Sequence, residues 1–131
     1  MKTRVYTKDD HAELAKWWTH HNWPVVTDEL LYGSTGFIVE NEGRMICAGF
    51  YYPSLGHWGW LEYVVTNPES GLKERAKAVD MLLERLKEFG QALGQKIFIA
   101  TLKSTGLMKA YQKHGFVKGD SGMTNMIARV S

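Results

Sequence analysis

The sequence HWGWLEYVVTNPESGLKERAKAVDMLLERLKEFG, residues 57–90, decides the fold because it joins a strand pattern directly to a helix pattern. Its first part is rich in aromatic and β-branched residues, which favour a strand. From Leu72 to about Leu93, apolar residues recur at helical spacing with a polar back, and Gly94 follows. The apolar run KIFIATL, residues 96–102, predicts another strand. This strand–helix–strand step is long enough to place two strands in parallel.

Further elements are predicted on both sides of this crossover. Two β-rich runs in GFIVENEGRMICAGFYYP flank residues 40–43 and predict a hairpin. Gly115 is expected to close the last helix in a left-handed conformation. The first helix is expected to be capped by Thr7, Asp9 or Asp10 and to run to about His20. The other expected elements are a strand at 4–7, a helical turn at 28–31, a helix at 105–114, and strands at 116–117 and 123–130.

These elements predict one α/β (α+β) domain over residues 1–131. Its sheet is expected to be mixed, mostly antiparallel and six- to seven-stranded, with helices on both faces. Strict alternation along residues 58–65 places one set of side chains on one face and the rest on the other. The first set is Trp58, Trp60, Glu62 and Val64, and the second is Leu61, Tyr63 and Val65.

Composition indicates a globular protein without a special environment. The 131 residues are 44% hydrophobic and 23% charged, with a formal net charge of +2. This balance gives no reason to expect a nucleic-acid or membrane partner. The single cysteine, Cys47, excludes an internal disulfide and is expected to be a buried small hydrophobe. With no apolar leader after Met1, we expect a cytoplasmic protein, and no histidine or cysteine spacing suggests a metal site.

Three motifs resemble the GNAT superfamily of acetyl-CoA-dependent N-acyltransferases. VVTNPES stands where the family leaves its fourth strand, VDMLLERLKEFGQALG matches its long helix, and LKSTGLMKAYQKHGF is similar to its strand–helix ending. The resemblance covers nearly the whole chain and implies acetyl-CoA as co-substrate. The compact size and the string WLEYVVTNP also resemble the small GNAT-like proteins of phages and prophages.

The chain departs from the family's pyrophosphate loop, Arg/Gln-x-x-Gly-x-Gly/Ala. When aligned on Leu82 and Leu83, the two glycine positions fall on Lys77 and Val79. A phosphate cradle needs backbone N–H groups and the positive end of a helix dipole, which any helix starting here supplies. The residues expected to bind the pyrophosphate are Ser70, Gly71, Lys73, Arg75 and Lys77, with free N–H groups at Ser70, Gly71 and Leu72. The alternative is an ordinary helix cap at Pro68 and Ser70.

Two side chains are candidates for proton transfer. Glu62 is the only acid in GHWGWLEYVV, and a carboxylate among aromatic residues has a raised pKa, which suits a general base. The alternative is an ordinary strand glutamate paired with a lysine. Tyr111 matches the tyrosine with which the family protonates the leaving thiolate. The alternative is that Tyr111 only packs the last helix against the sheet. His57 is a second candidate base, and His114 is expected to interact with a helix C-terminus.

The resemblance also implies where the cofactor arm lies. Backbone groups of Val64 and Val65 are expected to pair with the pantetheine arm between the two parallel strands. Ser104 stands where many family members have an asparagine that binds this arm, although it also suits a helix N-cap. The amine acceptor is expected to be a small molecule or a peptide. Five residues in or just after the first helix could line the acceptor pocket, and they are Trp17, Trp18, His20, His21 and Trp23. The alternative is that they are ordinary core and surface residues side by side.

Three functions remain open from the sequence. The first is an acetyl-CoA-dependent N-acetyltransferase that works by direct attack of the amine. The second is a catalytically inactive binding module with the same fold, for example a phage protein that engages a host or virion protein. The third is a structural accessory protein of a virion. A homodimer through the aromatic strand FYYPSLGHWGW is also left open.

Overall fold

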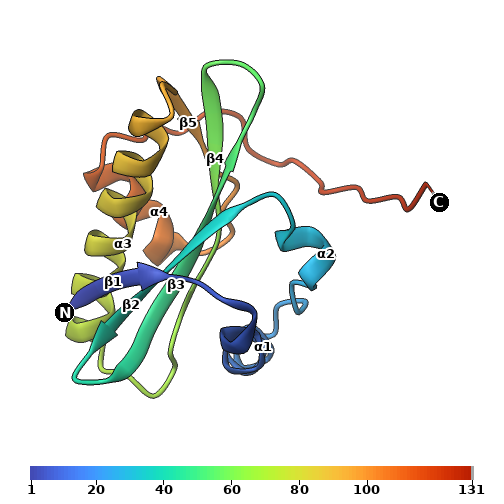
Figure 1. Cartoon of the computed structure of the whole chain (residues 1–131). Helices are drawn as coiled ribbons and strands as arrows, with labels where there is room; N and C mark the ends of the chain where they lie inside the picture. Colours follow the sequence, from blue (N-terminus) through green and yellow to red (C-terminus); the bar gives the residue numbers. More distant parts are fainter. Residues whose placement is uncertain (131) are drawn as a thin grey trace.

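The computed structural model describes residues 1–130, and it shows one mixed sheet with helices on both faces (Figure 1). The sheet order is β1-β2-β3-β4-β5. Neighbours are antiparallel from β1 to β4, and β4 and β5 are parallel. The elements are β1 (Lys2–Val5), the 3-10 helix η1 (Lys8–Asp10), α1 (His11–His20), α2 (Asp28–Leu31), β2 (Thr35–Asn41), β3 (Arg44–Pro53), β4 (Trp58–Thr66), α3 (Leu72–Ala92), β5 (Ile97–Ile99) and α4 (Thr105–Lys113).

Two hydrophobic clusters cover the two faces of the sheet. The first packs α3 and Tyr111 of α4 against the sheet and includes Leu61 and Val64 of β4. The second packs Leu14, Trp17 and Trp18 of α1 against the opposite face. Cys47 is fully buried, and burial raises the pKa of its thiol, as expected for a small core side chain. The predicted crossover and the helices on both faces are therefore confirmed.

The predicted hairpin is confirmed in its turn geometry. Glu42 and Gly43 both have positive φ, at 52° and 77°, between the paired residues Asn41 and Arg44. Two successive positive φ angles in a two-residue loop are typical of a type I′ turn, whose twist matches that of the strands. This turn lies beside the start of α3, because Asn41 and Arg44 both bind Glu74.

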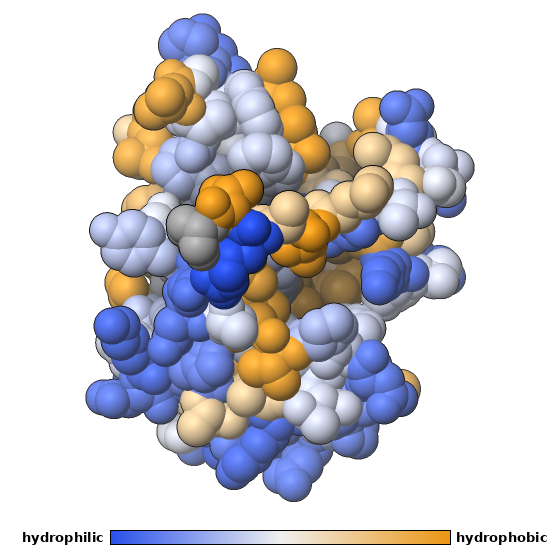
Figure 2. Space-filling view, turned by 90° about the vertical axis from the view of Figure 1, so that its right-hand side faces the viewer, coloured by the Kyte–Doolittle hydropathy of each residue, from blue (hydrophilic) through white to orange (hydrophobic). Residues whose placement is uncertain are grey.

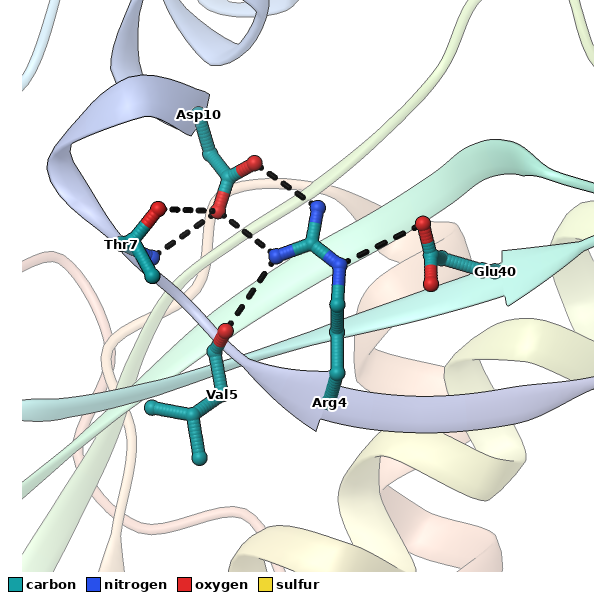
Figure 3. A network of polar contacts seen from close by, with 5 residues as sticks. All are labelled: Arg4, Val5, Thr7, Asp10 and Glu40. Atoms are coloured by element: carbon teal, nitrogen blue, oxygen red, sulfur yellow. Dashed lines mark hydrogen bonds and ion pairs between the residues drawn. The ribbon is translucent and has the colours of Figure 1, made fainter.

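A polar network fixes the N-terminal strand to the first helix (Figure 3). The Arg4 guanidinium donates two 2.8 Å hydrogen bonds to the Asp10 carboxylate, and its Nε lies 3.3 Å from Glu40 of β2. Asp10 also accepts the backbone N–H of Thr7 at 2.9 Å. The Arg4 hydrogen bonds hold the pKa of Asp10 below its usual range. The network therefore ties β1, β2 and the entry to α1 together.

The structure corrects the strand count to five. The predicted strands at 116–117 and 123–130 are not formed, and the run 96–102 is a strand only over Ile97–Ile99. Gly115, at φ 91°, ends α4 as predicted, and Phe116 still packs on Tyr111. Beyond Phe116 the chain extends away from the sheet, toward the side of α2 (Figure 1). A strand needs a neighbour with which to pair, and this segment has none among the described residues.

Candidate active site

The pairing between β4 and β5 ends after three residue pairs, the last of which is Trp60 with Ile99. At the start of this ladder, the Ile97 N–H donates to the His57 carbonyl. Continuing the same register would bring the Thr101 N–H to the Leu61 carbonyl. Instead, the Thr101 N–H donates to the Glu62 carboxylate at 2.7 Å, and the Tyr111 hydroxyl donates to the Leu61 carbonyl at 3.0 Å. The carboxylate of Glu62 and the hydroxyl of Tyr111 thus satisfy the N–H and the carbonyl that the next ladder hydrogen bond would have joined.

A β-bulge distorts β4 immediately beyond this point. Between the pairs Phe50–Glu62 and Ala48–Val65, β3 advances two residues and β4 advances three. The extra residue gives Tyr63 a φ of 57°, which is unusual for a bulky side chain. Such strain costs on the order of 1 kcal/mol or more and concentrates at functional sites.

The bulge corrects the predicted alternation along β4. Val64 lies in the same cluster as Leu61, beneath α3, and not on the face of Glu62. Tyr63 and Val65 lie in the opposite cluster, whereas the predicted alternation placed them on the same face as Leu61. The backbone between Glu62 and Val65 is therefore turned relative to a regular strand.

A pocket of about 310 Å³ lies beyond the point where the strands separate. Its volume falls at the lower end of the range for small-molecule sites, roughly 300–1,000 Å³. Its walls come from the end of β4, the beginnings of α3 and α4, and the segment after α1. The lining residues are His21, Trp23, Val64, Val65, Thr66, Leu72, Arg75, Ser104, Gly106 and Leu107.

The beginning of α3 forms one wall of the pocket. Gly71 is the N-cap and carries no side chain, and the first intrahelical bond runs from the Arg75 N–H to its carbonyl. The N–H groups of the first turn are therefore free to bind an anion. Arg75 lines the pocket, and its Nε is buried without a partner among the described residues. These features fit a phosphate group.

Ser70 corrects one detail of the predicted cradle. Its N–H is not free, because it donates to the Asn67 carbonyl at 3.1 Å. The Asn67 side chain accepts the N–H of Glu69 at 2.9 Å, which makes a tight turn before the helix. The Ser70 side chain is buried, and its hydroxyl has no partner among the described residues. Ser70 is not among the residues that line the pocket.

Charges are distributed unequally around the start of α3. Lys73 and Lys77 are exposed, and neither lines the pocket. The Glu74 carboxylate is held by Asn41 at 2.7 Å and by Arg44 at 3.2 Å, and these contacts lower its pKa. Arg75 is thus the predicted basic residue that the structure brings to the pocket.

Glu62 and Tyr111 have environments that suit proton transfer. Glu62 is half-buried, and burial raises its pKa to about 7, against the smaller opposing effect of the Thr101 N–H. A carboxylate with this pKa is available as a base near neutral pH. Tyr111 is buried, and burial and the charge of Glu62 both raise its pKa. Its hydroxyl therefore stays protonated at neutral pH and can act as a donor.

The remaining predicted residues fall into two groups. Ser104 caps α4, accepting the Leu107 N–H at 3.3 Å, as expected, and it also lines the pocket. His21 and Trp23 lie with ring centroids 4.9 Å apart at the pocket wall, whereas Trp17 and Trp18 are core residues. Outside the pocket, His57 is exposed.

His114 is also outside the pocket. It ends α4, with its Nε2 3.2 Å from Asp80 and its Nδ1 3.4 Å from Glu84 of α3. No group of His, Cys, Asp and Glu side chains suited to a metal occurs among residues 1–130. Within the same residues, no helix is both long enough and apolar enough to cross a membrane.

Comparisons with known proteins identify the architecture. No protein-family model and no curated protein matches the sequence. A Trypanosoma brucei acetyltransferase superposes with a TM-score of 0.70 at 19% identity, over 96% of this chain and 99% of the other. The aminoglycoside N-acetyltransferase AAC(6')-Iy, in complex with CoA, gives 0.68 at 15% identity over 96% and 93%. The chain has the fold of the GNAT acetyltransferases.

A third GNAT structure extends this likeness. The ribosomal-protein-alanine N-acetyltransferase from Brucella melitensis biovar Abortus 2308 gives a TM-score of 0.63 at 9% identity, with 99% of each chain covered. Sequence reasoning did not single out some residues of the pocket and of the point where the strands separate. Thr101 was missed because its role depends on where the ladder ends. Gly106 and Leu107 were missed although they lie in the first turn after the predicted cap Ser104, and this position was the available signal.

Proposed function

We propose that this protein is an acetyl-CoA-dependent N-acetyltransferase that transfers an acetyl group to an amine by direct attack. One observation carries the proposal. A pocket opens where β4 and β5 separate, and a carboxylate with a pKa of about 7 lies at the point of separation. The GNAT fold supports the same conclusion, because AAC(6')-Iy has this fold and binds CoA.

The residues around the pocket fit acetyl-CoA as co-substrate. The free N–H groups at the start of α3 and the guanidinium of Arg75 suit the pyrophosphate. The open hydroxyl of Ser70, buried beside Gly71, supplies a further hydrogen-bonding group. Val64, Val65 and Ser104 line the pocket and are the proposed contacts of the pantetheine arm. Lys73 and Lys77 contribute long-range attraction for the negative phosphates without contacting the pocket.

Glu62 and Tyr111 are the proposed base and acid. Glu62, directly or through water, removes a proton from the ammonium form of the acceptor, and the free amine attacks the acetyl carbonyl. A carbon–nitrogen bond forms, the carbon–sulfur bond breaks, and the Tyr111 hydroxyl gives its proton to the departing thiolate. The attacking nitrogen loses its second proton as the amide forms, and this proton, carried through water, restores the Tyr111 hydroxyl. In this structure the same hydroxyl donates to the Leu61 carbonyl, so this bond must exchange during the reaction.

The acceptor is proposed to be a small-molecule or peptide amine. AAC(6')-Iy is an aminoglycoside N-acetyltransferase, and the Brucella protein is a ribosomal-protein-alanine N-acetyltransferase, so both acceptor classes occur on this fold. His21 and Trp23, at the pocket wall nearest α1, are the proposed acceptor-side contacts. A planar aromatic surface at this position suits a cationic amine through cation–π attraction.

Titration calorimetry with acetyl-CoA is the test of the proposed function. We expect binding, and weaker binding by the Arg75→Ala variant. A radiolabelled acetyl-CoA assay on a panel of aminoglycosides, polyamines and peptides then identifies the acceptor. Absence of binding at millimolar acetyl-CoA would contradict the proposal and would favour a binding module that has kept only the fold.

A further inference from the structure

One part of the sheet faces the side of α1 and α2 without belonging to the core. The strand registers place five apolar side chains next to one another there, across β3, β4 and β5, because paired residues point to the same face. They are Tyr52, Trp58, Trp60, Ile97 and Ile99, and we call them the apolar face. Trp60 is at its centre, since it pairs with Tyr52 on one side and with Ile99 on the other.

Most of the apolar face is open to a ligand. Trp58, Trp60, Ile97 and Ile99 belong to neither of the two hydrophobic clusters, and the two isoleucines are 61% and 40% exposed. The two tryptophans are half-buried and pack edge to face, with ring centroids 4.3 Å apart. Figure 2 views the side of α2 and shows that hydrophobic residues, those of the chain end included, remain on the surface there. Contiguous exposed apolar side chains are typical of a site that binds a ligand or a partner.

The apolar face ends at the proposed base. Glu62 is two residues after Trp60 and shares its side of β4, because side chains alternate along this part of the strand. A strand rises about 3.3 Å per residue, so Trp60 is about 7 Å from Glu62 along β4, and Trp58 is about 13 Å away. His21 lies at the other end of the strand, 3.3 Å from the Thr66 carbonyl. An acceptor whose amine reaches Glu62 therefore meets the apolar face when it extends toward the beginning of β4.

The charges beside the apolar face suit a single amine. Burial raises the pKa values of Tyr52 and Tyr63, and among residues 1–130 Glu62 is the one carboxylate whose charge raises them further. On the neighbouring α2, the Glu29 carboxylate is already paired with Arg129 at 2.8 Å. A polycation such as an aminoglycoside needs several negative partners, whereas one carboxylate beside aromatic rings complements one ammonium group on an apolar body.

We propose that the acceptor is a primary arylalkylamine, which is an amine joined by a short alkyl chain to an aromatic ring. The proposal rests on the proposed function and names its substrate class. The amine lies at Glu62, and the ring lies on Trp60, between Tyr52 and Ile99. The indole of Trp60 offers the ring an edge-to-face or offset contact, which is the favoured geometry of aromatic pairs. The product is the N-acetyl derivative of the same amine.

The first test compares phenylethylamine with ethanolamine in the radiolabelled acetyl-CoA assay. Both are primary amines on a two-carbon chain, and only the first carries a ring. We expect kcat/KM to be about tenfold or more higher for phenylethylamine, because its ring leaves water for the apolar face. Kanamycin, an aminoglycoside with several amines, should be a poorer substrate than phenylethylamine.

Variants of the apolar face show whether Trp60 makes this distinction. Trp60→Ala should raise KM for phenylethylamine about tenfold and leave kcat and the KM for ethanolamine unchanged. Trp60→Phe keeps a ring and should restore most of the loss. Ile99→Thr keeps a β-branched side chain in β5, so the strand is retained, and it should raise the same KM about threefold. The matched control, Leu93→Ala, removes an exposed apolar side chain at the end of α3 and should behave like the parent.

A binding measurement separates this proposal from the proposed function. Phenylethylamine has no indole, so tryptophan fluorescence during its titration reports on the protein alone, with or without CoA. We expect a change of emission in the parent and in Leu93→Ala, and its loss in Trp60→Ala. Amine binding that depends on Trp60, without any acetyl transfer, would support the arylalkylamine site and would contradict only the proposed function.

Three results would overturn the arylalkylamine site. The first is an equal kcat/KM for phenylethylamine and ethanolamine. The second is a Trp60→Ala variant whose KM rises equally for both amines, which would indicate a general disturbance of β4. The third is a dimer in sedimentation equilibrium that Trp60→Ala dissociates, because a second copy of the chain would then cover the apolar face.

Discussion

The Glu62 carboxylate accepts the backbone N–H of Thr101 at 2.7 Å, just beyond the last ladder pair between β4 and β5. The contact satisfies an N–H group that separation of the strands would otherwise leave open. It also fixes the carboxylate at the point of separation, one residue before the bulge. A structural hydrogen bond and the proposed base are thus provided by the same side chain.

Replacing Glu62 with Gln should change the pH dependence of acetyl transfer. A base with a pKa of about 7 must lose its proton to act, so kcat/KM of the parent should rise with pH through about 7. The Glu62→Gln variant should lose this rise and fall in activity by roughly a hundredfold or more above pH 7. An unchanged pH profile in the variant would remove Glu62 from the mechanism.

The same substitution has an effect of opposite sign on stability. Burial raises the pKa of Glu62, so the folded state disfavours its charged form. The resulting loss of stability begins above the unfolded pKa of about 4.3 and is complete above about pH 7. We therefore expect Glu62→Gln to gain stability relative to the parent between pH 5 and pH 8, as measured by urea unfolding. Glu69→Gln, at an exposed turn, is the control and should show no such trend.

Tyr111→Phe should affect stability and catalysis separately. Loss of the buried hydroxyl leaves the Leu61 carbonyl without its partner and should cost about 1–3 kcal/mol of unfolding free energy. If Tyr111 is also the acid, kcat should fall by roughly a hundredfold. Tyr51→Phe is a matched control, because Tyr51 is a buried tyrosine whose hydroxyl binds Gln95. This control should lose stability and keep its kcat, whereas equal kcat values in both variants would reduce Tyr111 to a packing role.

Arg75→Ala should weaken acetyl-CoA binding more than changes at the neighbouring lysines. Arg75 lines the pocket, so its loss should raise Kd about tenfold, in line with a charged hydrogen bond to phosphate. Lys73→Ala and Lys77→Ala should each change Kd by less, and their effects should vanish in high salt. Titration calorimetry at two salt concentrations measures the difference. Equal effects at all three positions would mean that Arg75 makes no direct contact.

Asp10→Asn should make the protein less stable at neutral pH by about 1–3 kcal/mol, because the Arg4 guanidinium would lose its carboxylate partner. The lowered pKa of Asp10 means that its contribution is present above the unfolded pKa of about 3.9 and is lost as the pH falls below it. The difference from the parent should therefore shrink toward pH 3 in thermal unfolding. Asp9→Asn, at an exposed neighbour, should change little at any pH.

The predicted elements that proved correct have strong local signals. The long helix shows apolar residues at every turn, and the hairpin turn contains Gly43, which adopts positive φ readily. The phase of the helix also carries information about the site. Arg75 is four residues before the buried Val79, so it lies on the inner side, whereas Lys73 and Lys77 share the outer side.

The features that sequence reasoning missed depend on tertiary context. A positive φ at Tyr63 has no signature, since glycine or asparagine is the residue expected there. The length of β5 and the absence of strands after Phe116 depend on which edges meet, and a local pattern cannot specify that. Some residues that line the pocket, such as Arg75 and Ser104, could be named from the sequence, but the contacts of Glu62 and Tyr111 could not.

The bulge at Tyr63 interrupts the alternation of side chains along β4 by one residue. One inserted residue lets Leu61 and Val64, three positions apart, point into the same core, while Val65 points into the other. Deleting Tyr63 would leave Leu61 and Val64 two positions apart, so a regular strand would keep Val64 and Val65 on the sides that they already occupy. The extra residue is therefore not needed to fill the two cores. What it changes is the backbone beside Glu62, where the proposed base lies.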